Sequence, residues 1–82
     1  MELKEQILAK MIETAAPIFG KDPSELGSDT KFEEDLKAKS VNYVQIINVL
    51  KDEFDVEIPY LPFKRNQTFE EAADYVADLC DI

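Results

Sequence analysis

The sequence has no histidine and only one cysteine, Cys80. A single cysteine excludes a disulfide bond within the chain. Without histidine, the usual zinc sites and the serine–histidine and cysteine–histidine catalytic arrangements are missing. Acidic residues are abundant, but no nucleophile accompanies a base, and residues 52–59 lack the glycine and the ligand spacing of a calcium-binding loop. We therefore expect neither an enzyme nor a metal-binding protein.

Long hydrophobic runs are missing as well. Residues 1–10 mix Glu2, Lys4, Glu5 and Lys10 with apolar residues, so there is neither a signal-peptide core nor a membrane-spanning segment. Basic residues are scarce, at 9 against 18 acidic ones, which gives a formal net charge of -9. This charge repels nucleic acid and anionic lipid and favours partners with basic surfaces, although solubility alone is an equally good interpretation. We expect a cytoplasmic monomer that neither binds nucleic acid nor inserts into a membrane.

The length and the hydrophobic content of the chain are enough for one small domain over residues 1–82. The chain is 45% hydrophobic and 33% charged, which is the balance of a folded protein, and a chain this short cannot divide its core. Apolar residues at three- and four-residue steps predict an amphipathic helix from Glu2 to about Phe19, ending near Gly20.

The middle of the chain combines a long loop with a second helix. Residues 21–39 have the composition of a loop that contacts the core through Leu26, Phe32 and Leu36, and a loop of this length in a compact domain is usually functional. Helical periodicity returns over residues 40–54. The apolar residues that fall within one arc of this helix, and that we expect to be buried, are Tyr43, Ile46, Ile47, Leu50 and Phe54.

The last third is expected to hold a short helical turn and a final helix. Two prolines, Pro59 and Pro62, limit residues 60–66 to at most one short turn, from which Leu61 and Phe63 are available to pack. Thr68 with Glu71 forms a capping-box pattern before a helix that runs almost to the end of the chain, with Cys80 on its buried side. The predicted fold is an all-α bundle of three main helices plus one short helix, with a long first loop.

An acidic run over residues 32–36 leads through Asp35 and Leu36 to Ser40 and Val41. The similarity continues through the second helix and into the last one, at Val44, Leu50, Glu53, Phe54, Asp55, Glu57, Ile58, Pro59, Thr68, Phe69, Ala73, Tyr75 and Val76. This pattern resembles the acyl carrier protein family, in which an acidic loop precedes an Asp-Ser-Leu triplet and the second helix ends in Glu-Phe-(x)3-Ile-Pro. The resemblance implies an acyl-carrier-like bundle that carries acyl intermediates as thioesters in fatty acid, polyketide or specialised lipid biosynthesis.

In that resemblance, Ser40 takes the place of the serine that receives a 4'-phosphopantetheine arm from coenzyme A. The implied partners are a phosphopantetheinyl transferase and the enzymes that load and process acyl groups. Taken alone, a serine at the start of a helix is better interpreted as a cap, and only its sequence context favours modification. The two roles are compatible, because the positive end of the helix dipole also favours a phosphodiester.

Two groups of residues around Ser40 are candidates for binding. A carried apolar chain would be stabilised by about 0.8 kcal/mol per buried methylene, and the residues that could open to admit it serve equally well as an ordinary core. These candidate cavity residues are Tyr43, Ile46, Ile47, Leu50, Phe54, Ile58, Leu61 and Val76. The residues expected to form an exposed docking patch on the flank of the second helix are Lys39, Val41, Val44, Asn48 and Lys51.

The sequence departs from the family in its charges. Residues 36–51 contain three lysines and no acidic residue, and Lys39 replaces the usual aspartate before the serine. We therefore expect standard partners to dock poorly, with the acidic segments on either side as an alternative docking surface. Either this is a specialised carrier, or it is an unmodified interaction protein with the same fold. A Pro-(x)3-Phe-x-Arg spacing from Pro59 to Arg65 also resembles D-alanyl carrier proteins, which keeps an aminoacyl cargo as a further alternative.

Overall fold

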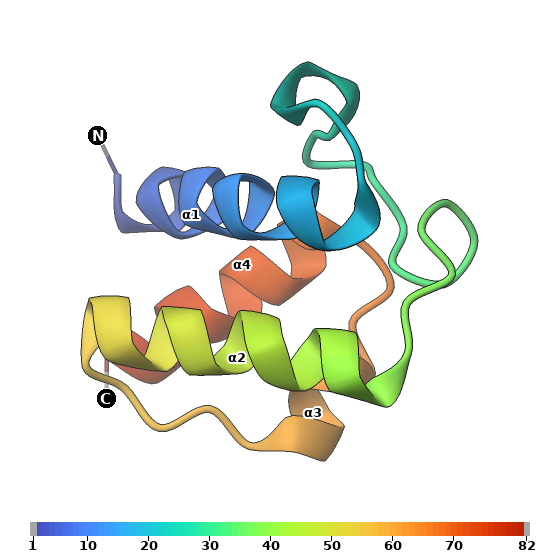
Figure 1. Cartoon of the computed structure of the whole chain (residues 1–82). Helices are drawn as coiled ribbons and strands as arrows, with labels where there is room; N and C mark the ends of the chain where they lie inside the picture. The colour runs from blue at the N-terminus through green and yellow to red at the C-terminus, as the bar shows by residue number, and fades with distance from the viewer. Residues whose placement is uncertain (1, 82) are drawn as a thin grey trace.

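The computed structural model describes residues 2–81, which form a bundle of helices (Figure 1). The elements are α1 (Leu3–Phe19), a 3-10 turn η1 (Pro23–Glu25), α2 (Ser40–Phe54), α3 (Tyr60–Lys64) and α4 (Phe69–Cys80). Helix α1 packs against α4 and α2, and the short α3 packs against α2 and α4. Within the described residues there is no strand and no helix long and apolar enough to cross a membrane. The prediction of an all-α bundle is confirmed.

The three main helices begin and end within one residue of their predicted bounds. Helix α1 ends at Gly20, whose φ of 64° is a left-handed conformation that glycine adopts without strain. Helix α4 begins at the predicted cap, where the Thr68 hydroxyl accepts a hydrogen bond from the Glu71 N–H at 3.1 Å. The Glu71 carboxylate accepts in turn from the N–H of Gln67 at 2.8 Å, one residue earlier than in a standard capping box.

The loop between α1 and α2 is held by hydrogen bonds to the start of α4. The N–H of Phe32 donates to the Gln67 carbonyl and the N–H of Phe69 donates to the Thr30 carbonyl, both at 3.0 Å. Leu26 and Phe32 are buried as predicted, while Leu36 is half-buried. Sequence analysis missed η1, which begins where the Asp22 carboxylate accepts from the Ser24 N–H at 2.9 Å, a hydrogen bond that lowers the pKa of Asp22.

A cluster of aromatic rings fills the space between the loop, α2, α3 and α4. Phe32 lies at its centre, with ring centroids 5.1 Å from Tyr43, 6.0 Å from Phe63 and 4.7 Å from Phe69. All four side chains are at most 1% exposed. Because offset and tilted ring contacts add to the free energy of area burial, this cluster fixes the end of the loop against the first turns of α2.

Three sequence predictions about burial need correction. Leu61 was expected to pack in the core, but it is 64% exposed, because residues two apart on a helix point to opposite sides and Phe63 takes the inward position of α3. Phe54, at the end of α2, is half-buried. Cys80, the last residue of α4, is also half-buried, and burial followed by the charge of Asp81 raises the pKa of its thiol.

Candidate attachment site at the start of helix α2

Ser40 is the first residue of α2 and is exposed to solvent. Its hydroxyl makes no hydrogen bond with any residue in the range 2–81. The expectation that Ser40 caps the helix is wrong, because Lys39 occupies the N-cap position with φ of -111° and ψ of 169°. The Ser40 hydroxyl is therefore available for chemistry without loss of a structural contact.

The N-cap residue Lys39 is held by a side chain inside the helix, not by its own side chain. Lys39 has no acceptor atom in its side chain and cannot receive a hydrogen bond from the helix N–H groups. Instead, the Asn42 side-chain oxygen accepts from the Lys39 N–H at 2.8 Å, and the Lys39 carbonyl accepts from the N–H of Asn42 at 2.9 Å. This leaves free N–H groups in the first turn of α2, with a positive helix end facing the position of Ser40.

A compact turn over residues 31–38 delivers the chain to Ser40. The Asp35 carboxylate accepts from the Lys31 N–H at 2.9 Å, and the N–H of Ala38 donates to the Phe32 carbonyl at 3.0 Å. Lys37 turns the chain in a left-handed conformation with φ of 53°. Since Phe32 is locked in the aromatic cluster, these bonds give Ser40 a rigid base, although it follows a long loop.

The predicted docking residues all lie on the exposed side of α2. Val41 and Val44 are 59% and 42% exposed, as expected from the helical arc. Lys39, Asn48 and Lys51 are exposed as well, but the Lys51 ammonium is paired with the Glu57 carboxylate at 3.3 Å. Sequence analysis missed Leu61, the other large apolar side chain that the structure exposes, because a helix as short as α3 shows no readable periodicity.

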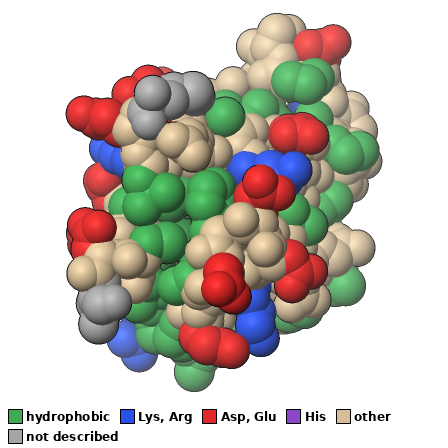
Figure 2. Space-filling view, turned by 90° about the vertical axis from the view of Figure 1, so that its left-hand side faces the viewer, with side chains coloured by type: hydrophobic (Ala, Val, Ile, Leu, Met, Phe, Trp, Pro, Cys, Tyr) green, Lys and Arg blue, Asp and Glu red, His purple; other side chains and the backbone are tan. Residues whose placement is uncertain are grey.

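Negative charge gathers at the end of the bundle remote from Ser40. Figure 2 shows this end, where α1 begins and α2 and α4 end, with acidic side chains spread around a hydrophobic area. The acidic residues at these helix ends include Glu5, Asp52, Glu53, Asp55, Asp78 and Asp81. Around Ser40, by contrast, Lys37 and Lys39 add positive charge. These two lysines offset part of the negative charge of Glu33, Glu34 and Asp35, which are exposed in the turn before Ser40.

Six of the eight predicted cavity residues belong to the buried core. They are Tyr43, Ile46, Ile47, Leu50, Ile58 and Val76, each at most 7% exposed. The inclusion of Leu61 was wrong, and Phe54 lies only partly in the core. That these six residues move apart to admit an acyl chain stays a prediction.

Comparisons with known proteins agree with this arrangement. The family described as "Phosphopantetheine attachment site" matches residues 9–76. The acyl carrier protein of Rubrobacter xylanophilus is 40% identical over 75 residues, covering 92% of this chain and 93% of the relative. The acyl carrier protein of Lactobacillus johnsonii is 32% identical over 73 residues, covering 89% and 91%. That of Cyanidioschyzon merolae is 30% identical over 73 residues, covering 89% and 80%.

The helical bundle, the exposed serine at a helix start and these matches define a phosphopantetheine-binding carrier domain. The chain belongs to the acyl carrier protein family. Its function is that of an acyl carrier, with phosphopantetheine as the cofactor, and it interacts with acyl-processing enzymes. Within residues 2–81 no group of side chains is arranged to hold a metal ion.

Proposed function

We propose that Ser40 is the residue that receives the phosphopantetheine group, and that a phosphopantetheinyl transferase attaches it. The observation that carries this proposal is the exposed Ser40 hydroxyl, which has no hydrogen bond to residues 2–81 and stands on the first residue of α2. The free N–H groups and positive dipole at this helix end favour a phosphodiester there. When bound, the group supplies a thiol that holds the acyl cargo as a thioester.

The chain itself contributes position and access. The turn over residues 31–38 and the Lys39–Asn42 contact hold Ser40 at a fixed place on the surface. Lys39 adds a positive charge beside the serine, and this charge favours a phosphodiester there. The same charge weakens the binding of any partner whose docking surface is basic, as is common for partners of acidic carriers. We therefore propose a dedicated transferase and dedicated loading enzymes.

The test of the attachment site is the intact mass of the protein after incubation with coenzyme A and a promiscuous phosphopantetheinyl transferase. We expect a gain of one phosphopantetheinyl group in the parent protein and none in Ser40→Ala. Ser28→Ala is the matched control, because Ser28 is also an exposed serine but lies in the loop between α1 and α2 and not at the start of a helix. Modification of Ser40→Ala would rule out the assignment.

We also propose that partners dock on the exposed flank of α2. Val41 and Val44 supply the apolar contact and Leu61 of α3 extends it, while Lys39, Asn48 and Lys51 supply its polar border. Apolar side chains exposed next to a reactive group are a common feature of interaction sites. Val44→Asp should raise the transferase KM or lower kcat/KM without changing the fold. An unchanged rate in this variant would exclude the α2 flank from docking.

A further inference from the structure

The positive charges of this acidic chain are concentrated in two segments. Residues 36–51 and 58–69 contain none of the 18 acidic residues but five of the 9 basic ones. The first segment includes α2 as far as Lys51, and the second includes α3 and the connection to α4. The five basic residues are Lys37, Lys39, Lys51, Lys64 and Arg65. The net charge of -9 therefore arises entirely outside these two segments.

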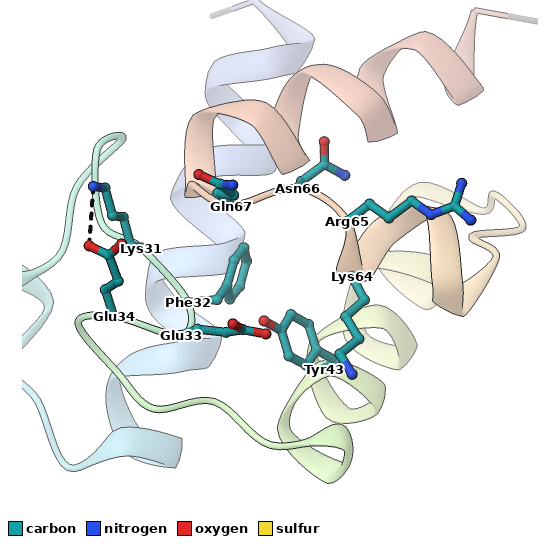
Figure 3. Close-up of a pocket in the computed structure, with 9 residues that line it drawn as sticks. All are labelled: Lys31, Phe32, Glu33, Glu34, Tyr43, Lys64, Arg65, Asn66 and Gln67. Atoms are coloured by element: carbon teal, nitrogen blue, oxygen red, sulfur yellow. Dashed lines mark hydrogen bonds and ion pairs between the residues drawn. The ribbon is translucent and has the colours of Figure 1, made fainter.

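Folding places the two segments next to each other. Helix α3 packs against α2, and the rings of Tyr43 and Tyr60 lie 6.5 Å apart between centroids. A surface hollow of about 260 Å³ has Tyr43, Lys64 and Arg65 in its lining, and Figure 3 shows the Arg65 side chain directed away from the hollow. Tyr43 follows Ser40 by three residues, a spacing that makes neighbours on a helix. The cations at the end of α3 therefore lie near the start of α2.

The same surface carries the exposed apolar side chains. On α3, Lys64 and Arg65 follow Leu61 by three and four residues, so the three side chains share one face. The Arg65 N–H donates to the Leu61 carbonyl at 3.2 Å, which extends the helical geometry to Arg65. On α2, Val41 and Val44 are exposed at the same spacing. We call this surface the α2–α3 face; its members are Lys39, Val41, Val44, Leu61, Lys64 and Arg65.

The cations of the α2–α3 face have no anionic partner within the described chain. Lys39, Lys64 and Arg65 form no ion pair with any residue in the range 2–81, whereas four other lysines are each paired with a carboxylate. The Lys64 ammonium instead lies 5.9 Å from the centre of the Tyr60 ring. Acidic residues outnumber basic ones two to one in this chain, and yet these three charges stay available to an anion outside it.

Acidic residues border the face only in the turn before α2. The Asp35 carboxylate accepts a hydrogen bond from the Lys31 N–H at 2.9 Å, and the Glu34 carboxylate lies 3.2 Å from the Lys31 ammonium. Glu33 lines the hollow at the edge of the face. A partner that lies over α2 and α3 therefore meets more unpaired positive charge than negative charge.

We propose that the α2–α3 face is the docking surface for enzymes whose own contact surface is acidic, the reverse of the basic surface common for partners of acidic carriers. The proposal rests on the attachment at Ser40 proposed above and adds the sign of the partner's charge. Complementary charges speed association and like charges oppose it, while Val41, Val44 and Leu61 supply the apolar contact. At physiological salt, charges more than about 8 Å away are largely screened, so the local cations outweigh the distant acidic residues.

A protein partner fits this face better than a membrane does. The net charge of -9 repels anionic lipid over the rest of the molecule. Only three large apolar side chains are exposed within residues 2–81, which is much less than the apolar stripe of a helix that lies in a membrane surface. Three apolar side chains beside unpaired cations are instead a small apolar centre with a charged rim, as in an interface between proteins.

The test uses a promiscuous phosphopantetheinyl transferase with a basic docking surface and a variant of it in which the basic residues of that surface are replaced by glutamate. Intact mass gives kcat/KM for modification of Ser40 by each enzyme. The carrier is compared with a reversed variant that combines Lys64→Glu with Arg65→Glu. Because the glutamates can also slow the transferase itself, the measured quantity is the ratio of kcat/KM for the acidic enzyme to that for the basic enzyme.

We expect this ratio to fall about tenfold from the parent carrier to the reversed variant. Added salt should raise kcat/KM for the parent with the basic enzyme and lower it with the acidic one. Lys21→Glu is the control, because Lys21 is exposed, forms no ion pair within residues 2–81 and lies outside both segments. An unchanged ratio in the reversed variant, or an equal fall in Lys21→Glu, would overturn the proposal.

Failure of both enzymes to modify the parent would count against Ser40 and not against the α2–α3 face. The face is then tested without a partner, by the broadening of amide NMR signals with an anionic and a cationic paramagnetic cosolute of equal size. The anionic cosolute should broaden Val41 and Leu61 more strongly, and the cationic one should broaden Asp78, at the acidic end. Stronger broadening of Val41 and Leu61 by the cationic cosolute would overturn the proposal.

Two further measurements identify other occupants of the face. Cosedimentation with vesicles that contain anionic lipid, lost in the reversed variant, would assign the face to a membrane. A dimer in sedimentation velocity, lost in the same variant, would assign it to the acidic end of a second copy. Either result would overturn the proposal, and we expect neither vesicle binding nor a dimer.

Discussion

The ring of Phe32 lies 5.1 Å from the ring of Tyr43, centroid to centroid, and this contact joins the loop before α2 to the first turn of the helix that begins at Ser40. Phe32 also contacts Phe63 and Phe69, so one side chain holds together the loop, α2, α3 and α4. Through this contact a residue eight positions before Ser40 determines where the serine stands.

Removal of the Phe32 ring should therefore destabilise the whole domain. We expect Phe32→Ala to lower the free energy of unfolding by about 3–5 kcal/mol, because the ring is 1% exposed and leaves a cavity among three other rings. Urea denaturation measures this directly. Phe19→Ala, at the half-buried end of α1, should cost less. A loss below about 1 kcal/mol for Phe32→Ala would show that the cluster repacks without it.

Lys39→Asp should stabilise the protein. The present N-cap residue places a positive charge at the positive end of α2 and offers no acceptor to its N–H groups, whereas aspartate corrects both. We expect a gain of about 1 kcal/mol in the free energy of unfolding. Lys39→Gln removes the charge without providing a short capping side chain and should gain less. Equal effects of the two substitutions would mean that capping contributes nothing here.

The stability of the protein should fall at alkaline pH in part through Tyr43. Burial, with smaller effects from Glu33 and Tyr60, raises the pKa of Tyr43 above its ordinary value of about 10. The folded state then holds the phenol proton more tightly than the unfolded state, so this contribution is complete below pH ~10 and is lost as the pH rises through the folded-state pKa.

Tyr43→Phe isolates that contribution. At pH 7 its stability should lie within about 1 kcal/mol of the parent, because the hydroxyl has no hydrogen bond to residues 2–81. Above pH ~10 the parent should lose stability faster than the variant. Part of the alkaline loss is common to both proteins, because the hydrogen bond to Asp74 raises the pKa of Lys4. Parallel pH profiles for the two proteins would contradict the assignment to Tyr43.

Asp55→Gly should stabilise the end of α2. Asp55 is in a left-handed conformation with φ of 52° and also places a negative charge at the negative end of the helix. Glycine removes both costs, and we expect a gain of about 1 kcal/mol in the free energy of unfolding. Asp52→Gly, within the same helix, should instead lose about 1 kcal/mol. The prediction is checked by measuring the free energy of unfolding of both variants, which should change in opposite directions.

The main helices were predictable because their signals are local. Apolar spacing, Gly20 and the Thr68 cap are each read within a few residues, and each marks a helix end to within one residue. The position of Ser40 at the start of α2 was predicted for the same reason. The turn η1 and the Lys39–Asn42 contact were missed. Both depend on hydrogen bonds between a side chain and the nearby backbone, and the same residues can adopt other local conformations equally well.

The sequence by itself determined an all-α fold, the place of Ser40 at the start of α2, and the family to which the chain belongs. Only the tertiary structure decided that Leu61 faces solvent while Phe63 enters the core, because a helix of one turn has no periodicity to show its buried side. It also decided that Lys64 and Arg65 line the same surface hollow as Tyr43. These residues are about twenty positions apart in the chain and meet only because the aromatic cluster brings α3 against the first turns of α2.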